Sequence, residues 1–212
     1  MATKPNFRYE DDHAPTPVIG LDEVGRGPLA GPVVAAAVYI PTAKRKHPVW
    51  SSVKDSKQLT PQRRDILFDV IQQQCSYGIG SASVAEIDEI NILQATFLAM
   101  RRAIANMPPL PHVSPVMLID GNRTPKDWPW QCVTLIKGDA LSVSIAAASI
   151  LAKVTRDHLM CNLAEQFPAY GWADNAGYGT PSHLDALEKW GATAHHRQSF
   201  APIKNLLLSR AG

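Results

Sequence analysis

The sequence of 212 residues predicts an α/β fold in which a central mixed β-sheet is flanked by helices. Three observations lead to this prediction. Short apolar runs rich in Val, Ile and Ala alternate with segments whose apolar residues recur at helical spacing. The hydrophobic share of 45% and the charged share of 19% are typical of a globular domain with its own core. The length suits one substantial domain with at most a small appendage.

The expected elements alternate between strands and helices. Strands are expected at 18–21, 31–40, 77–84, 116–119 and 132–136, where apolar runs lie between turn residues. Helices are expected at 61–74, after the capping-box pattern Ser83-Val-Ala-Glu86, and at 91–106, 142–167 and 181–190. Leu93, Phe97 and Met100 form an apolar stripe in the helix at 91–106, which indicates a core-facing side.

Charge and cysteine content restrict the class of protein. The formal net charge of +2 does not by itself indicate a nucleic-acid-binding protein, although acids at a catalytic centre could offset a basic groove. Cys75, Cys132 and Cys161 are odd in number and widely spaced, which favours a reducing, cytoplasmic location. No apolar stretch approaches the roughly 20 residues that span a bilayer, so no membrane association is expected.

Four acids are expected at the ends of strands that share one sheet. Asp22 and Glu23 follow the first strand, Asp120 follows the fourth, and Asp139 comes shortly after the fifth. Such carboxylates repel one another unless cations compensate them, and hard oxygen donors favour Mg²⁺ or Mn²⁺ over zinc. The pattern therefore predicts a divalent-metal site suited to phosphoryl transfer with two metal ions. The alternative is a solvated acidic strand end that pairs with Arg26.

Seven motifs, in order, resemble those of bacterial ribonuclease HII from Val18 to the end of the chain. They are GLDEVGRGPLAGPV, DSKQL, LIDGNR, KGD, SIAAASILAKVTRD, GYGTPSH and GATAHHRQSF. The resemblance implies an RNase H-like fold and an endonuclease that hydrolyses the RNA strand of RNA/DNA hybrids. It also implies incision 5′ of single ribonucleotides in duplex DNA, which leaves 3′-hydroxyl and 5′-phosphate ends and serves ribonucleotide and RNA-primer removal.

The same resemblance implies a domain organisation and the catalytic residues. Residues 1–16 are expected to form a flexible polar extension, 17–168 the catalytic domain, and 169–212 a helical region that completes the substrate groove. The match gives Asp22, Glu23, Asp120 and Asp139 as the ligands of two Mn²⁺ or Mg²⁺ ions. Asp157 is the rival for the fourth position, and the alternative for it is an exposed helix residue beside Arg156.

Residues that contact the substrate are also implied. The turn Gly25-Arg26-Gly27 is matched to ribonucleotide contact, since bare backbone can approach a 2′-hydroxyl, and Tyr178 is matched to packing on the neighbouring sugar. The helical spacing of Ser149, Lys153 and Arg156 suggests a stripe that faces a phosphate backbone. Further candidates for phosphate contact are Lys57 and His195-His196-Arg197, with solvated charges as the alternative.

Two other functions remain open at this point. One is a related nuclease that cuts DNA structures without requiring a ribonucleotide, and the other is a binding module that keeps the fold but lacks activity. The expected partners are RNA/DNA hybrids and ribonucleotide-containing duplex DNA. A monomer is expected, and the tail Asn205–Gly212 could fold onto the domain or contact a sliding clamp.

Overall fold

A computed structural model describes residues 4–110 and 114–211 of the chain. The strands are β1 (Val18–Val24), β2 (Val33–Tyr39), β3 (Ser76–Ala82), β4 (Val116–Asp120) and β5 (Gln131–Leu135). The α-helices are α1 (Arg8–Asp11), α2 (Pro61–Gln74), α3 (Val84–Ala105), α4 (Val143–Gln166), α5 (Trp172–Asn175), α6 (Pro181–Trp190) and α7 (Ala201–Ala211). Short 3₁₀ turns lie at Thr42–Lys44, Pro48–Ser51, Ser56–Gln58, Gly138–Ala140 and Pro168–Tyr170.

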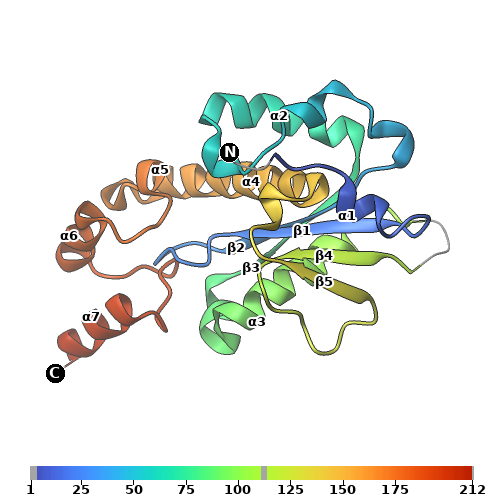
Figure 1. Cartoon of the computed structure of the whole chain (residues 1–212). Coiled ribbons are helices and arrows are strands. Elements are labelled where there is room, and N and C mark those ends of the chain that lie inside the picture. The colour runs from blue at the N-terminus through green and yellow to red at the C-terminus, as the bar shows by residue number, and fades with distance from the viewer. Residues whose placement is uncertain (1–3, 111–113, 212) are drawn as a thin grey trace.

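The strands form one mixed sheet in the order β3-β2-β1-β4-β5. β2 is antiparallel to both β1 and β3, whereas β1, β4 and β5 are parallel. The C-terminal ends of the three parallel strands therefore meet at one edge of the sheet. This arrangement confirms the predicted mixed sheet flanked by helices, and it delivers the ends of β1, β4 and β5 to the same place (Figure 1).

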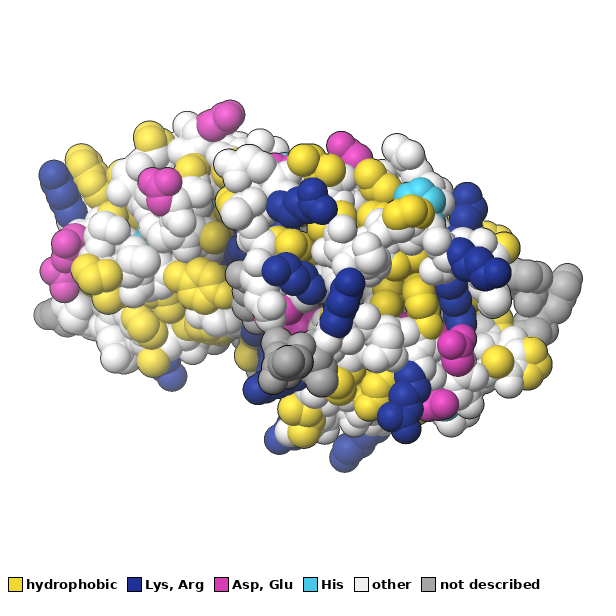
Figure 2. All heavy atoms as spheres, turned by 45° about the horizontal axis from the view of Figure 1, so that its top comes forward, with side chains coloured by type: hydrophobic (Ala, Val, Ile, Leu, Met, Phe, Trp, Pro, Cys, Tyr) yellow, Lys and Arg dark blue, Asp and Glu magenta, His cyan; other side chains and the backbone are white. Residues whose placement is uncertain are grey.

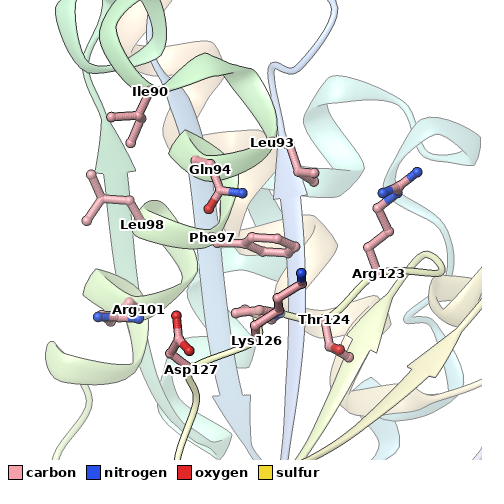
Figure 3. A pocket seen from close by; sticks show the side chains of 11 residues that line it. Ile90, Leu93, Gln94, Phe97, Leu98, Arg101, Arg123, Thr124, Lys126 and Asp127 are labelled. Carbon is pink, nitrogen blue, oxygen red and sulfur yellow. The ribbon is translucent and has the colours of Figure 1, made fainter.

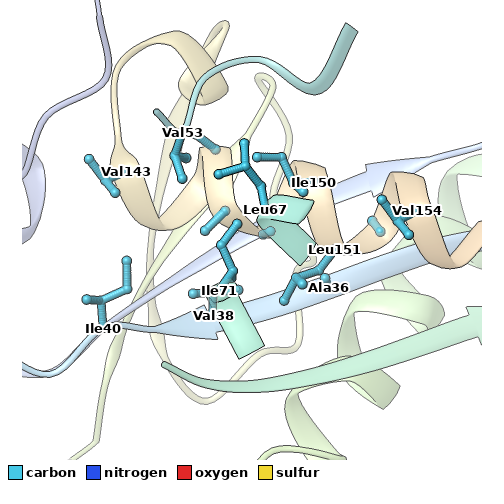
Figure 4. Packing of buried hydrophobic residues seen from close by; sticks show 14 of the residues in the cluster. Ala36, Val38, Ile40, Val53, Leu67, Ile71, Val143, Ile150, Leu151 and Val154 are labelled. Carbon is cyan, nitrogen blue, oxygen red and sulfur yellow. The ribbon is translucent and has the colours of Figure 1, made fainter. Parts of the chain in front are cut away.

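Helices cover both faces of the sheet. α2 and α4 lie over one face and α3 lies over the other (Figure 1). The first core forms where α2 and α4 meet β2, with Leu67 and Ile71 of α2 packed near Ile150 and Leu151 of α4 (Figure 4). The run Ala146-Ala147-Ala148 is fully buried there, and such small side chains allow α4 to approach the sheet closely. The second core lies between α3 and the opposite face.

α3 consists of two helical segments that meet at a kink. Asn91 has φ 66° and ψ 162°, which interrupts the helix, and its side-chain oxygen accepts hydrogen bonds from the N–H groups of Leu93 and Gln94. Asn91 therefore acts as the N-cap of the second segment. The capping box of Ser83 and Glu86 is present at the start of the first segment, so both predicted helix starts are confirmed.

The described part of the N-terminal segment packs against the domain. Glu10 of α1 is 2% exposed, and its Oε1 accepts hydrogen bonds from the hydroxyls of Ser142 and Ser144 and from the N–H of Ser144. A carboxylate at this position stabilises the N-terminus of α4. Mobility of residues 1–16 stays a prediction, but residues 4–16 are in contact with the body of the protein rather than extended away from it.

α5, α6 and α7 form a smaller region beside the end of α4 (Figure 1). Its core contains Met160, Trp172, Leu187 and Ile203, and it also includes Leu29 from the loop after β1. α7 thus packs onto the rest of the chain through the fully buried Ile203, and Leu206 of the tail packs against the same core. Within the described residues, no helix combines the length and apolar character needed to cross a membrane.

Candidate active site

The sheet brings the predicted acids together. The register of β1 and β4 pairs Leu21 with Ile119, so the next residues, Asp22 and Asp120, fall side by side at the end of the two strands. The 3₁₀ turn Gly138–Ala140 begins three residues after β5 and carries Asp139. Its first residue, Gly138, donates its N–H to Oδ1 of Asp120 at 2.6 Å. The turn after β5 is thereby fixed against the end of β4.

Electrostatic coupling links all four acids. Burial raises the pKa of Asp22 well above its ordinary value, and the carboxylates of Glu23, Asp120 and Asp139 raise it further. Burial also raises the pKa of Glu23, although Arg26 opposes this shift. The carboxylates of Asp22 and Glu23 therefore lie in an environment that disfavours their negative charge. A divalent cation would reverse this effect, and the donors are the hard carboxylate oxygens that Mg²⁺ and Mn²⁺ prefer.

In the described part of the chain, no three Asp, Glu, His or Cys side chains converge closely enough to enclose a metal ion as they stand. Two of the carboxylates instead accept hydrogen bonds from nearby groups of the protein. Oδ1 of Asp22 accepts the N–H of Glu23 at 2.7 Å, and Nη1 of Arg26 lies 3.2 Å from Oε1 of Glu23. The acids fit a metal site in donor type and in their common location at the ends of β1 and β4.

Asp157 is not among the acids that raise the pKa of Asp22, whereas Asp139 is. The Asp157 carboxylate pairs with Lys153 at 2.7 Å and with Arg64 at 3.6 Å. It therefore belongs to an ion-pair network between α4 and α2. Asp157 is thus partly buried and paired rather than exposed beside Arg156, and its exclusion from the metal site stays a prediction.

The turn Gly25-Arg26-Gly27 begins two residues after the acidic pair, and its first residue has a backbone conformation that favours glycine. Gly25 has φ +91°, and a Cβ atom there would lie 2.2 Å from Nε of Arg156. Only glycine meets both requirements. A Cβ atom on Gly27 would lie 3.5 Å from Cε1 of Tyr178, so the turn and the tyrosine ring are neighbours. The structure thus brings together two features that lie about 150 residues apart in sequence.

A buried network positions the backbone of Tyr178. Nδ1 of His183 lies 2.8 Å from the Tyr178 carbonyl oxygen and donates its proton to it. The unprotonated Nε2 of His183 then accepts from Trp172 and from His196, each at 3.1 Å. His196 accepts the N–H of Thr193 on Nδ1, consistent with a proton on its Nε2. Burial lowers the pKa of both rings, that of His196 to about 4, so both are neutral at pH 7. The Tyr178 side chain is 47% exposed above this network.

Two predicted phosphate contacts are wrong. Arg156 is fully buried and donates to the carbonyls of Ala30, Pro32 and Ala176 rather than to solvent. The His195-His196-Arg197 motif was also expected at the surface, yet His196 and Arg197 are fully buried. Helical spacing indicates which side of α4 carries Arg156. It does not indicate that the loop after β1 covers this side of the helix.

The remaining predicted contacts have mixed outcomes. Ser149 is 6% exposed and its hydroxyl lies 2.8 Å from that of Ser56, so it joins α4 to the segment before α2 and is not presented to a phosphate. Lys153 is partly buried and paired with Asp157. Its substrate contact stays a prediction. The side chain of Lys57 lies outside the described residues.

Sequence reasoning missed a cavity beside the acids. A small pocket of about 70 Å³ lies between Glu23 and Asp120 and is bordered by Phe97 and Arg123. Phe97 and Arg123 also border a larger cavity of about 710 Å³ between α3 and residues 123–127. Figure 3 shows Phe97 on α3 facing the loop that carries Arg123 and Lys126. The apolar stripe predicted that this side of α3 faces the core. Helical periodicity cannot show that the edge of the stripe, at Leu93 and Phe97, borders a cavity.

The charges around the site are unevenly distributed. Arg101, Arg123 and Lys126 line the large cavity against a single acid, Asp127. On the face drawn in Figure 2, by contrast, the Lys and Arg side chains are interspersed with acidic and apolar ones. The small net charge of the chain thus coexists with a locally basic cavity next to the acidic cluster.

A mixed sheet with covered faces and acids grouped at the ends of parallel strands defines the class of metal-dependent nucleases with an RNase H-like fold. Comparison with known proteins gives the family. The sequence profile of the family described as Ribonuclease HII matches residues 19–203. The chain belongs to the ribonuclease HII family. Enzymes of this family are metal-dependent nucleases that hydrolyse RNA in RNA/DNA hybrids.

Relatives match over nearly the whole chain. Ribonuclease HII of Cereibacter sphaeroides (strain KD131) is 51% identical over 196 residues, which cover 92% of this chain and 89% of that protein. Ribonuclease HII of Gluconobacter oxydans is 49% identical and covers 98% of both chains. Among solved structures, ribonuclease H2 from Pyrococcus horikoshii OT3 superposes with a TM-score of 0.74 at 27% identity, covering 91% of this chain and 98% of that one. The RNase H-like fold is thereby confirmed.

Proposed function

We propose that this protein incises duplex DNA 5′ of a single embedded ribonucleotide, in addition to hydrolysing the RNA strand of hybrids. The products carry 3′-hydroxyl and 5′-phosphate ends, and the reaction serves removal of ribonucleotides and RNA primers from DNA. The observation that carries this proposal is the position of the Gly25-Arg26-Gly27 turn. It follows the acidic pair by two residues and lies against Tyr178, so a sugar could contact the turn while its phosphate lies at the acids.

Asp22, Glu23, Asp120 and Asp139 are proposed to hold two divalent cations. When bound, Mg²⁺ or Mn²⁺ would activate the attacking water and stabilise the leaving oxygen. The acids position this chemistry at the end of β1 and β4, and no protein nucleophile is needed. Bst-RNase HIII, which is 21% identical with a TM-score of 0.69, was solved in complex with Mn²⁺. Mn²⁺ is therefore the first metal to test.

Recognition of the ribonucleotide is assigned to the backbone of the turn and to the Tyr178 ring. A 2′-hydroxyl is the group that distinguishes RNA from DNA at a given site, and it can both donate and accept a hydrogen bond. Backbone at Gly27 can approach a sugar because no side chain intervenes, whereas the missing side chain of Gly25 leaves room for Arg156. The half-exposed tyrosine ring next to Gly27 provides a flat surface for the adjacent sugar.

The substrate is proposed to extend from the acids into the large cavity between α3 and residues 123–127. That cavity adjoins the small pocket at Glu23 and Asp120, because Phe97 and Arg123 line both. Its cations suit a phosphate backbone. The region 169–212 would border the groove on the opposite side through Tyr178, which completes the proposed division into a catalytic domain and a C-terminal region.

The decisive experiment uses three end-labelled duplexes of one sequence: all DNA, DNA with one ribonucleotide, and an RNA/DNA hybrid. We expect cleavage of the second and third with Mn²⁺ or Mg²⁺, no cleavage of the first, and none after chelation. Asp120→Asn is the matched inactive control because it keeps the shape of the side chain. Product mapping should place the cut 5′ of the ribonucleotide.

Two outcomes would replace this proposal by the alternatives. Equal cutting of the all-DNA duplex would indicate a nuclease that recognises DNA structure. Binding without metal-dependent cleavage of any duplex, unchanged in Asp22→Asn, would indicate a binding module. The proposed role of Gly25 adds a second test, since Gly25→Ala should lose cleavage while Asp157→Asn retains it.

Protein partners and location are proposed on fewer observations. A ribonuclease HII from Archaeoglobus fulgidus, 26% identical with a TM-score of 0.67, was solved in complex with PCNA. Leu207 and Leu208 on α7 are 38% and 64% exposed and offer an apolar surface for a comparable sliding-clamp contact. Loss of clamp binding in a Leu208→Ser variant would support this contact. We propose a cytoplasmic monomer, in agreement with the free thiols of all three cysteines.

A further inference from the structure

Two fully buried arginines surround the recognition turn and its continuation to Pro32. Arg156 comes from α4 and Arg197 from the segment before α7, and both are fully shielded from solvent. Burial lowers the pKa of Arg156, and burial together with the nearby Arg156 lowers that of Arg197 to about 9. The two guanidinium groups thus carry an electrostatic cost. Such a cost calls for an explanation beyond filling the core.

Arg197 connects the Gly25-Arg26-Gly27 turn to Gly31, which lies further along the same loop. Its Nη2 donates to the carbonyl of Gly25 at 2.6 Å and to that of Gly31 at 2.8 Å. Nη1 donates to the carbonyl of Arg26 at 3.0 Å, and Nε to the carbonyl of Gly31 at 3.0 Å. The backbone N–H of Arg197 also donates to the Leu29 carbonyl at 2.8 Å. One side chain therefore fixes three carbonyls of a loop that is about 170 residues away in sequence.

These hydrogen bonds determine the direction of two amide groups. In a planar trans peptide the C=O and the following N–H point in opposite directions. With the carbonyls of Gly25 and Arg26 directed toward Arg197, the N–H groups of Arg26 and Gly27 point away from it. Gly27 lies beside the half-exposed ring of Tyr178. The buried guanidinium thus fixes the donors that the turn offers to a ligand.

We propose that Arg197 is a positioning residue for ribonucleotide recognition: it holds the Gly25 and Arg26 carbonyls inward so that the Arg26 and Gly27 amides face the sugar at the cleavage point. This inference rests on the function proposed above for the turn. A guanidinium suits the task because its N–H donors lie in one rigid plane and can reach several carbonyls at once. A lysine ammonium keeps the charge but not this planar fork.

The experiment compares Arg197→Lys and Arg197→Ala with Leu187→Ala. Leu187 is buried in the same C-terminal core, and its apolar side chain cannot hydrogen-bond to the turn. Leu187→Ala therefore reports the effect of destabilising that core alone. Steady-state cleavage of the duplex with one ribonucleotide is measured for each variant, together with its thermal midpoint, at a temperature where every variant is folded.

We expect kcat of Arg197→Lys to fall by about 10- to 100-fold, with KM changed far less, because misdirected amides misplace the reacting sugar. Leu187→Ala should keep kcat despite a comparable loss of thermal stability. Guanidinium ion, at concentrations well below denaturing ones, should restore part of the activity of Arg197→Ala, whereas ammonium at equal ionic strength should not. If Arg197→Ala does not fold, Arg197→Lys decides.

An Arg197→Lys enzyme whose kcat falls no further than that of Leu187→Ala would overturn the proposal. So would equal rescue of Arg197→Ala by guanidinium and ammonium. The wild type separates this failure from failure of the proposed function. If it prefers the ribonucleotide-containing duplex while the variants behave like the control, only the role of Arg197 is rejected. If the wild type cuts the all-DNA duplex equally well, both inferences fail.

Discussion

Replacing Asp22 by Asn should stabilise the metal-free protein while it abolishes cleavage. Asp22 is 5% exposed at the end of β1, so burial disfavours its charge, and the carboxylates of Glu23, Asp120 and Asp139 repel it in addition. An asparagine has the same shape, and its Oδ1 can still accept the N–H of Glu23, which lies 2.7 Å from Oδ1 in the wild type. The substitution thus removes the repulsion and leaves the local hydrogen bond in place.

The size of the effect follows from the strand spacing. Asp22 and Asp120 lie side by side on adjacent strands, about 5 Å apart in a sheet. Two unit charges at that separation repel by about 3 kcal/mol at an effective dielectric constant of about 20. Partial solvation of Asp120 reduces this energy, so we expect a gain of about 2 kcal/mol in the free energy of unfolding. For a chain of this length that gain raises the melting temperature by about 4–8 °C.

The gain should depend on pH in a defined direction. The pKa of Asp22 in the folded protein lies above its value in the unfolded chain, so the folded state binds this proton more tightly. The contribution of Asp22 to wild-type stability is therefore highest below the unfolded pKa of about 4 and is lost as pH rises through the folded pKa. The advantage of Asp22→Asn should be largest at alkaline pH and shrink as the pH approaches 4.

Thermal unfolding of metal-free wild type, Asp22→Asn and Asp157→Asn at several pH values tests this reasoning. Asp157→Asn is the control, because its carboxylate is paired with Lys153 and Arg64 and its loss should not stabilise the protein. Adding Mn²⁺ should stabilise the wild type more than Asp22→Asn. A lower melting temperature for Asp22→Asn at pH 8, or a gain that does not change with pH, would refute the repulsion argument.

Other parts of the structure give three further expectations. Lys126→Ala should weaken binding of a long duplex and reduce the slope of log K against log salt by about 0.9, the change expected for loss of one phosphate contact. An unchanged slope would show that Lys126 does not contact a phosphate. In the native protein a thiol reagent should label the exposed Cys161 but not Cys75, whose burial raises its pKa to about 12, and labelling of both on unfolding is the control. Gly20→Ala should lower the melting temperature strongly, because its Cβ would lie 2.4 Å from the backbone carbon of Ser144; overpacking of this kind costs about 1–3 kcal/mol, and a near-native melting curve would contradict it.

Much of the fold could be predicted from the sequence because its elements have local signals. The helix at 61–74 begins with a threonine cap and a proline, and α2 has these bounds. The helix expected at 91–106 corresponds to the second segment of α3, which Asn91 caps. The short helix α1 was missed, because four residues have no detectable period and their position depends on Glu10 reaching the start of α4.

The acidic cluster was predictable for a topological reason. Each acid follows an apolar strand, and parallel strands present their C-terminal ends at one edge, so knowing the strands nearly determines where the acids meet. The positions of Asp22 and Asp120 follow in this way from the register of β1 and β4. Pairing of Glu23 with Arg26 was foreseen only as an alternative to metal binding. In the structure the pair lies within the cluster, where it partly offsets the charge of Glu23.

The arginines could not be assigned from the sequence, and the reason is physical. A cation beside a motif usually indicates a solvated side chain or a phosphate contact, because burial of an arginine requires carbonyls that converge from distant segments. For Arg197 those carbonyls belong to Gly25, Arg26 and Gly31, in a loop whose proximity depends on the complete fold. The residues expected to touch the phosphates are thus found beneath the surface that would touch the sugar. Their effect on the substrate would be exerted through the backbone of the turn, which is why kcat rather than affinity is the quantity that should reveal it.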